Sequence, residues 1–339
     1  MAYHQLRIAK IIQETPDARS FVLDVPANLA DKFRYRAGQF LTFRVPHGEG
    51  AFDRCYSLSS APEADGQMKV TVKRVAGGKG SNWFNDALKE GATIDVLPPA
   101  GRFVLSDSAH PLLLFGGGSG ITPMMALIKS ALKGGARRMR LFYANRDKPS
   151  IIFDAELLQL IASHLSRLEV IHHLDAEQGL TQPAEVLGAL KGFEGAEAFL
   201  CGPGPFMDMV EKTLLGAGMP RDRVRLERFE ASGNDAVPVE QAEGDVIPDH
   251  ITIHFEGKVH RVPYKKGQTI LEAARAAGLN PLSSCEEGFC ASCAAKSIKG
   301  KIVLAKNDIY TDDDLANHWI LTCQGHCFGP EVEITYDVT

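Results

Sequence analysis

Three cysteines near the end of this 339-residue chain stand close enough together to hold an iron–sulfur cluster. Cys285, Cys290 and Cys293 form a C-x4-C-x2-C loop, and two further cysteines, Cys323 and Cys327, follow later in the chain. Thiolates in this spacing, completed by one distant cysteine, ligate [2Fe–2S] clusters. Because such a cluster carries one electron at a time, the spacing predicts an electron carrier.

Two other interpretations of these thiols fit the chain less well. Structural zinc prefers paired C-x2-C knuckles, and the sequence has one such pair. A disulfide framework is disfavoured because the chain has seven cysteines, an odd number, in a large charged sequence. The fourth iron ligand could be Cys323 or Cys327. The stretch Leu321-Thr322-Cys323 resembles the last-ligand site of plant-type ferredoxins, which favours Cys323.

Residue types suited to flavin binding occur near the N-terminus, in the stretch Arg54-Cys55-Tyr56-Ser57. A guanidinium can pair with a phosphate, a tyrosine ring can cover an isoalloxazine face, and a serine hydroxyl can bond the flavin edge. The glycine-rich residues 77–80 then lead into a helix start, which is a natural anion site. Each pattern alone also fits ordinary surface residues or a capped helix.

A second glycine-rich stretch, residues 116–123, predicts a dinucleotide site. It follows the apolar run 112–115 and leads into an apolar helix, so backbone amides can approach a pyrophosphate. The common fingerprint G-x-G-x-x-G fails, because Ile121 stands where its last glycine belongs. We expect Thr122 to cap the helix and Pro123 to take its first position.

Two later positions bear on the nicotinamide nucleotide. Cys201 ends a predicted strand, and ligands gather at the carboxyl ends of strands in a doubly wound sheet. The alternative is that Cys201 is a buried small hydrophobe, as free cysteines often are. Arg146 could bind a 2′-phosphate, whereas the adjacent Asp147 favours a 2′-hydroxyl. We expect NADH, with NADPH as the alternative.

The elements that must position these residues fall into three domains. Residues 1–106 contain alternating, β-rich runs that predict an antiparallel β-barrel. Residues 107–230 alternate strands with helices, which predicts an α/β domain with a doubly wound parallel sheet. Residues 231–248 are polar and lack periodicity, so they predict a linker. Residues 249–339 combine a hairpin, a helix and the cysteine loop.

Capping residues indicate where two further helices begin. Ser81 can cap a helix that Gly91 ends. Thr269 and Glu272 have the spacing of a capping box, so a helix should start at Thr269.

Together, the first 230 residues resemble the ferredoxin–NADP reductase superfamily. The matching stretches, in the family's order, are 54–57, 77–82, 98–103, 116–123, 201–203 and 227–229. The resemblance implies that Arg54, Tyr56 and Ser57 hold FAD, and that Gly80 and Ser81 cradle its pyrophosphate. The full set of implied cofactor-binding residues is Arg54, Tyr56, Ser57, Lys73, Gly80, Ser81, Gly117, Gly118, Gly120, Thr122, Arg146, Cys201, Gly202, Pro203 and Phe229. Hydride transfer would be positioned by Tyr56, Ser57, Cys201 and Phe229, with no catalytic acid or base.

The added cysteine-bearing module is similar to that of reductase components of bacterial oxygenases, ketosteroid 9α-hydroxylases among them. The resemblance implies a multidomain protein whose third part is a β-grasp (α+β) ferredoxin domain. Such a reductase takes hydride from NADH onto FAD and passes single electrons through the cluster to a Rieske-type oxygenase. Two alternatives stay open: a reductase subunit of a phenylacetyl-CoA epoxidase-type complex, and a permanent electron-transfer subunit of a larger redox enzyme.

Composition limits the remaining function classes. The net charge is −5 and no basic patch is evident, so nucleic acid is not an expected partner. The N-terminus lacks the apolar stretch of a signal peptide, and no apolar run is long enough to span a bilayer. We therefore expect a cytoplasmic monomer with no membrane contact.

Overall fold

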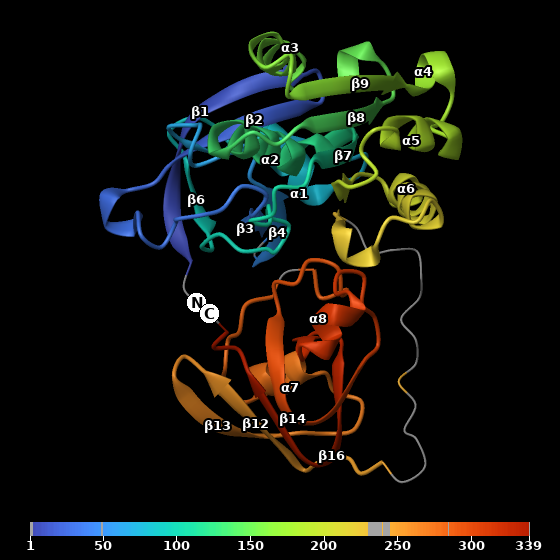
Figure 1. Ribbon diagram of the computed structural model, residues 1–339. Coiled ribbons are helices and arrows are strands. Elements are labelled where there is room, and N and C mark those ends of the chain that lie inside the picture. The colour runs from blue at the N-terminus through green and yellow to red at the C-terminus, as the bar shows by residue number, and fades with distance from the viewer. Residues whose placement is uncertain (1–2, 49, 230–238, 240–244, 284, 339) are drawn as a thin grey trace. The chain divides into compact units, whose positions relative to one another are not determined.

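The structure is a computed structural model that describes residues 3–48, 50–229, 239, 245–283 and 285–338. The chain divides into two compact units, the first of which ends at Phe229 (Figure 1). Most of the predicted linker, residues 231–248, lies outside the described residues.

The first part of the chain forms a six-stranded antiparallel sheet in the order β4-β3-β6-β1-β2-β5. Its strands are β1 His4–Thr15, β2 Ala18–Asp24, β3 Phe40–His47, β4 Gly50–Ser57, β5 Met68–Lys73 and β6 Thr93–Val96. A bridge between Leu58 and Val70 joins the two edges, so the sheet closes into a barrel. Phe84 of helix α1 (Lys79–Asp86) packs edge-on against Phe21 and Phe43 in its core. The predicted antiparallel barrel is confirmed.

The predicted start and end of α1 are wrong. The helix begins two residues before Ser81 and ends at Asp86, well short of Gly91. Gly78 takes the N-cap position, and Ser81 lies in the first turn, where its hydroxyl accepts a 3.1 Å hydrogen bond from the Val75 amide. The serine therefore holds the preceding glycine-rich loop in place.

The next part is a five-stranded parallel sheet in the order β11-β10-β7-β8-β9. Its strands are β7 Leu112–Gly117, β8 Met139–Asn145, β9 Leu168–Leu174, β10 Glu197–Cys201 and β11 Val224–Glu227. Its helices are α2 Ile121–Gly134, α3 Asp154–Ser163, α4 Asp175–Gln178, α5 Pro183–Leu190 and α6 Gly204–Gly216. The predicted doubly wound α/β domain is confirmed.

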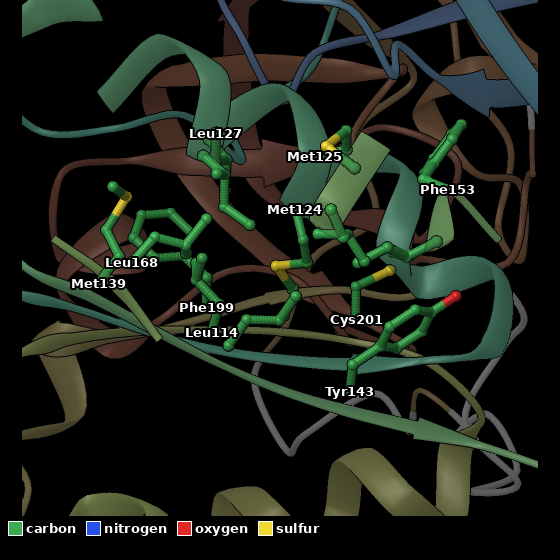
Figure 2. Packing of buried hydrophobic residues seen from close by; sticks show 14 of the residues in the cluster. Leu114, Met124, Met125, Leu127, Met139, Tyr143, Phe153, Leu168, Phe199 and Cys201 are labelled. Carbon is green, nitrogen blue, oxygen red and sulfur yellow. The ribbon is translucent and has the colours of Figure 1, made fainter. Parts of the chain in front are cut away.

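Alternation along β7 explains why helices cover both faces of this sheet. Leu112 and Leu114 join a buried cluster with α2 and α3, whereas Leu113 and Phe115 join a second cluster with α5 and α6. Successive strand residues point to opposite faces, so an unbroken apolar run needs cover on both sides. Figure 2 shows the first cluster, with Cys201 among its members.

The second unit contains a five-stranded mixed sheet in the order β13-β12-β16-β14-β15. Its strands are β12 His250–Phe255, β13 Lys258–Pro263, β14 Ala294–Leu304, β15 Trp319–Leu321 and β16 Gly325–Thr335. Strands β12 and β16 are parallel and the other pairs are antiparallel. Helix α7 (Ile270–Ala276) packs on this sheet, and α8 is Asp312–Ala316. This is the predicted β-grasp arrangement.

The capping box predicted before α7 is confirmed. The Thr269 hydroxyl accepts a 3.2 Å hydrogen bond from the Glu272 amide, and the Glu272 carboxylate accepts a 2.9 Å bond from the Thr269 amide.

Within the part of the chain that the structure describes, no helix is both long and apolar enough to cross a bilayer.

Candidate functional site

The four predicted iron ligands converge beside α7 and β15 as two neighbouring pairs of thiols. Cys290 hydrogen-bonds Cys285 and raises its pKa above the ordinary value, and Cys323 does the same to Cys293. The charge of Cys285 also raises the pKa of Cys293, so the two pairs lie near each other. Neighbouring thiols raise each other's pKa because two adjacent thiolates repel. A cationic metal centre between them would offset this repulsion and favour the thiolate forms.

The other cysteine candidate, Cys327, belongs to the core of this domain. Its side chain is fully buried in the apolar cluster that includes Ile270 and Ile334. Burial raises the pKa of the Cys327 thiol to about 12. The apolar cluster around Cys327 includes none of the four predicted ligands, which suits a packing residue. All seven cysteines are free of disulfides.

Short polar contacts brace the cysteine loop. The buried Thr322 hydroxyl donates to the Cys293 carbonyl at 2.9 Å, and the Ser292 hydroxyl lies 3.2 Å from the Cys290 sulfur. Gln324 donates to the Glu286 carbonyl at 2.7 Å. Each of these contacts involves a residue next to one of the four cysteines in the sequence, so the loop that would hold the cluster is braced by its own side chains.

The flavin-binding candidates Arg54, Tyr56 and Gly80 meet at one place on the barrel. A Cβ atom added to Gly80 would lie 2.9 Å from the Arg54 Cγ atom and 3.2 Å from the Tyr56 hydroxyl. Glycine is therefore required where the start of α1 passes over the end of β4. The first turn of a helix beside a guanidinium forms a cradle for a phosphate, so these residues fit a flavin pyrophosphate.

Packing fixes the Tyr56 and Arg54 side chains. The Tyr56 ring packs edge-on against Phe84 at 4.9 Å between centroids, and burial raises the pKa of Tyr56 above its ordinary value. The exposed Arg54 guanidinium lies over the Phe52 ring at 4.6 Å and donates to the Asp53 carbonyl. Tyr56 is therefore a neutral, rigid surface, and Arg54 presents its charge to solvent.

The glycine loop between β7 and α2 is in backbone contact with the end of β10. A Cβ on Gly120 would lie 2.0 Å from the Cys201 carbonyl oxygen, and one on Gly117 would lie 2.8 Å from Pro203. A Cβ on Gly202 would reach the Gly117 backbone at 3.0 Å. The two loops meet only because these positions are glycine, and they bring the buried Cys201 thiol to the start of α2.

The predicted cap of α2 is wrong. The short helical turn Gly118–Gly120 precedes the helix, which begins at Ile121, and its N-cap is Gly120. The Thr122 hydroxyl instead donates to the Ser119 carbonyl at 3.0 Å. This leaves the first backbone amides of α2 without a side-chain cap, as expected where a phosphate group of a ligand completes the helix terminus.

Lys73 lies beside the second glycine loop. Its ammonium is 3.8 Å from the position that a Gly118 Cβ would take, and 3.8 Å from the Asp17 carboxylate. The resemblance implied that Lys73 binds a cofactor, without indicating which one. Its position next to Gly118, which has the φ of +53° that favours glycine, supports a role at the nucleotide phosphates.

Arg146 and Asp147, which were predicted to select the nucleotide, are bonded to each other. The Arg146 Nε atom lies 2.9 Å from the Asp147 carboxylate and its Nη2 atom bonds the Ser150 hydroxyl. Hydrogen bonding by Ser150, and then by Arg146, lowers the pKa of Asp147. Asp147 also caps a short helical turn by accepting from the Ser150 amide. Asp147 therefore stabilises its own loop, and the Arg146 guanidinium remains largely exposed.

The structure adds one residue that the sequence analysis did not single out. Glu227, at the end of β11, is buried and accepts a 2.7 Å hydrogen bond from the Ser57 hydroxyl. Burial raises the pKa of Glu227 to about 8, while the Ser57 bond opposes the shift. Burial and then Glu227 raise the pKa of Cys201. Ser57, Cys201 and Glu227 therefore form one buried polar group where the barrel meets the parallel sheet.

Phe229 ends the first unit and is half exposed. The preceding Arg228 bonds Asp208 of α6 at 2.6 Å and is itself largely buried. That ion pair fixes the segment that follows Glu227. The only signal for Glu227 in the sequence was its place next to Arg228 and Phe229 in a matching stretch.

Three domain families match successive parts of the chain. They are described as the oxidoreductase FAD-binding domain over residues 5–105, the oxidoreductase NAD-binding domain over 114–212, and the 2Fe-2S iron-sulfur cluster binding domain over 253–327. The predicted cofactors, FAD, a nicotinamide nucleotide and a [2Fe–2S] cluster, are confirmed.

Similar proteins extend over nearly the whole length. The chain is 43% identical over 338 residues to the 3-ketosteroid-9-alpha-monooxygenase ferredoxin reductase component of Rhodococcus rhodochrous, covering 98% of this chain and 96% of that protein. It is 30% identical over 354 residues to one of the subunits of 1,2-phenylacetyl-CoA epoxidase from Escherichia coli K12, covering 99% and 98%. Among solved structures, the chain is similar to phthalate dioxygenase reductase, with 27% identity and a TM-score of 0.61 over 98% of each chain. That structure is described as modular, for electron transfer from pyridine nucleotides to [2Fe–2S].

Proposed function

This chain belongs to the family of oxygenase reductase components that join FAD-binding, NAD-binding and [2Fe–2S] domains, and we propose that it carries electrons from NADH to a ketosteroid-hydroxylating oxygenase. Flavin takes two electrons as a hydride and releases them singly, which matches a one-electron cluster. The higher identity to the ketosteroid system, 43% against 30%, favours that partner over a phenylacetyl-CoA epoxidase.

The observation that carries the proposal is the buried group formed by Ser57, Cys201 and Glu227. It joins the end of β4, where the flavin-binding residues lie, to the ends of β10 and β11, where nucleotide ligands gather. Ser57 and Cys201 would position the two rings against each other. Glu227, neutral below its raised pKa, holds a proton beside them without adding a buried charge.

The remaining residues would bind the two nucleotides. Arg54 and the first turn of α1 would hold the flavin pyrophosphate, with the Tyr56 ring against the isoalloxazine. The uncapped start of α2 and the Lys73 ammonium would hold the phosphates of NADH. Phe229 would stack near the flavin ring.

The four cysteines Cys285, Cys290, Cys293 and Cys323 would ligate the cluster. We propose an FAD-binding domain over 1–106, an NAD-binding domain over 107–230, a linker over 231–248 and a ferredoxin domain over 249–339. In this assignment every residue with a redox role lies outside the linker, whose part is to connect the two units.

Partner specificity tests the proposed function. The purified chain is combined with a purified ketosteroid 9α-hydroxylase oxygenase, its steroid substrate and NADH, and product formation is measured. A phenylacetyl-CoA epoxidase oxygenase with its own substrate is assayed in parallel. We expect product in the steroid reaction at a rate that rises with the concentration of this chain. If product forms only in the epoxidase reaction, the partner is the epoxidase and not the steroid oxygenase. If product forms in neither reaction, both proposed partners are excluded.

A further inference from the structure

A buried lysine on α2 is bonded to carboxylates from both sides of the boundary between the barrel and the parallel sheet. The Lys129 side chain is only 5% exposed, and its ammonium lies 2.8 Å from the Asp65 carboxylate and 3.1 Å from that of Glu156. Asp65 belongs to the barrel, in the loop between β4 and β5, whereas Glu156 lies in the first turn of α3. Lys129 therefore bridges two domains of the first unit.

The network continues back into the barrel. The second oxygen of Glu156 lies 3.5 Å from the ammonium of Lys69 on β5, and this ammonium is 5.0 Å from the centre of the Phe153 ring. Asp65 is also held on its own side, because it accepts a 2.7 Å hydrogen bond from the Ala61 amide. Two cations and two carboxylates thus alternate across the domain boundary, and their charges balance.

The surrounding surface brings α2 close to the barrel. Ala126, one turn before Lys129, packs in a small buried cluster with Ala37 and Ala61 of the barrel. A Cβ on Gly38 would lie 1.9 Å from the Phe103 carbonyl and 3.0 Å from Leu127 of α2. Small residues allow the close approach, but their side chains do not interlock and so do not fix the orientation of the helix on the barrel.

The ion pairs of Lys129 are directional, so they can fix the orientation that small apolar residues leave open. Replacing a buried ion pair by apolar side chains is often neutral or stabilising, so a buried lysine is poor support for stability alone. Its carboxylate partners are satisfied by one placement of the ammonium, which selects one orientation of α2 against the barrel. The same helix begins at Ile121, after its N-cap Gly120, where the nucleotide phosphates would bind.

We infer that Lys129 is a positioning residue for hydride transfer, because it fixes the helix that holds NADH against the domain that holds the flavin. This inference rests on the proposed function. Eight residues separate Lys129 from Ile121, which corresponds to about 12 Å along the helix. A tilt of about 5° at the lysine would therefore displace the phosphate site by about 1 Å, and displacements of this size can cost about 100-fold in rate.

The test uses the full-length protein with its cofactors and compares four variants. Lys129→Met removes the ammonium while keeping side-chain length and helix propensity. Asp65→Asn weakens the inter-domain half of the network from the barrel side. Lys129→Arg retains a cation and serves as the conservative variant. Lys133→Met, at an exposed position near the end of the same helix, is the matched control.

Stopped-flow mixing with NADH measures flavin reduction, the dissociation constant for NADH and the long-wavelength charge-transfer absorbance of nicotinamide stacked on flavin. We expect Lys129→Met and Asp65→Asn to lower the limiting rate by at least about tenfold and to weaken the charge-transfer band. The dissociation constant should stay within about threefold, because the phosphate contacts are intact. Lys129→Arg should recover part of the rate, and Lys133→Met should match the unmodified protein.

Three outcomes separate the possibilities. Rates and charge-transfer absorbance within twofold of the unmodified protein in both Lys129→Met and Asp65→Asn would overturn the inference, as would a loss of thermal stability alone. If Lys129→Met fails to fold, Asp65→Asn decides, because Asp65 lies on a loop and is partly exposed. Failure of the unmodified, flavin-loaded protein to be reduced by NADH would contradict the proposed function instead.

Discussion

At the scale of single residues, the first unit depends on a carboxyl group that is buried without a cation beside it. Among the described residues, Glu227 has Ser57 as its one hydrogen-bond partner, and burial raises its pKa to about 8. A neutral carboxyl can lie next to the Cys201 thiol and an uncharged ring system at little electrostatic cost, whereas a carboxylate cannot. The position therefore links the protonation of the site to the stability of the fold.

The Glu227→Gln variant should lack a loss of stability that the natural protein shows as pH rises. The folded pKa is raised above the ordinary value of 4.5, so the glutamate costs nothing below about pH 4.5 and progressively more as pH rises towards 8. Relative to Glu227→Gln, the natural protein should become less stable by about 3 kcal/mol between pH 5.5 and pH 8.5. Urea unfolding of both proteins across this range measures the difference. A constant difference would show that Glu227 does not titrate on folding.

Exchange of single cysteines should separate the ligand from the packing residue. Cys323→Ser removes one of the four paired thiols, so we expect loss of the visible cluster absorbance and of the EPR signal of the reduced protein. Cys327→Ser, four residues away, is the matched control and should keep the cluster, with a lower melting temperature because a hydroxyl enters the apolar core. Retention of the cluster in Cys323→Ser together with its loss in Cys327→Ser would reverse the assignment.

At the scale of elements, glycine loops set where the nucleotide helices begin. Gly120 caps α2 and lies against the Cys201 carbonyl, so this one contact aligns the start of α2, the proposed phosphate site, with the end of β10. Gly80 has the same part in bringing α1 over Arg54 and Tyr56. The start of α2 is thus fixed by backbone contact with a strand end, and the start of α1 by contact with two side chains of β4. Neither helix has a side-chain cap.

Substitution of Gly120 by alanine should damage the nucleotide site more than the fold as a whole. The added methyl would lie 2.0 Å from the Cys201 carbonyl oxygen, so the loops must separate. We expect at least about a tenfold weaker affinity for NAD⁺, measured by isothermal titration calorimetry, with FAD content unchanged. Gly134→Ala, at the far end of the same helix where no atom lies within 4 Å of the new methyl, should bind NAD⁺ normally. Equal affinity in both variants would contradict the assigned phosphate site.

Local patterns were sufficient for some of these features and insufficient for others. The cysteine spacing and the glycine-rich runs are contained in short stretches, so the cluster and both loops could be predicted. Periodicity predicted the barrel and the α/β domain, and the family resemblance implied the β-grasp domain. The cap at Ser81 was misplaced because the extended Gly78 precedes the helix instead. The cap at Thr122 was misplaced because the helical turn Gly118–Gly120 runs directly into α2. Glu227 and Lys129 could not be predicted as functional, since each acquires its partners only when distant strands and helices come together.

At the scale of the whole molecule, three cofactor-binding parts follow one another in the order in which electrons would travel. The first unit combines the flavin and nucleotide domains, and the second carries the four cysteines. Contacts within the first unit are rich in directional bonds, such as Ser57 to Glu227 and Lys129 to Asp65. Hydride transfer requires a fixed geometry, and we propose that these bonds provide it.

Anaerobic titration of the purified protein with NADH, followed by visible absorbance and EPR spectroscopy, tests the central claim most directly. The account predicts that NADH bleaches a bound flavin and that the EPR signal of a reduced [2Fe–2S] cluster then appears in the same sample. A flavin that is reduced while the cluster stays oxidised would contradict transfer between the two units. Reconstituted protein that binds neither flavin nor cluster would contradict the account as a whole.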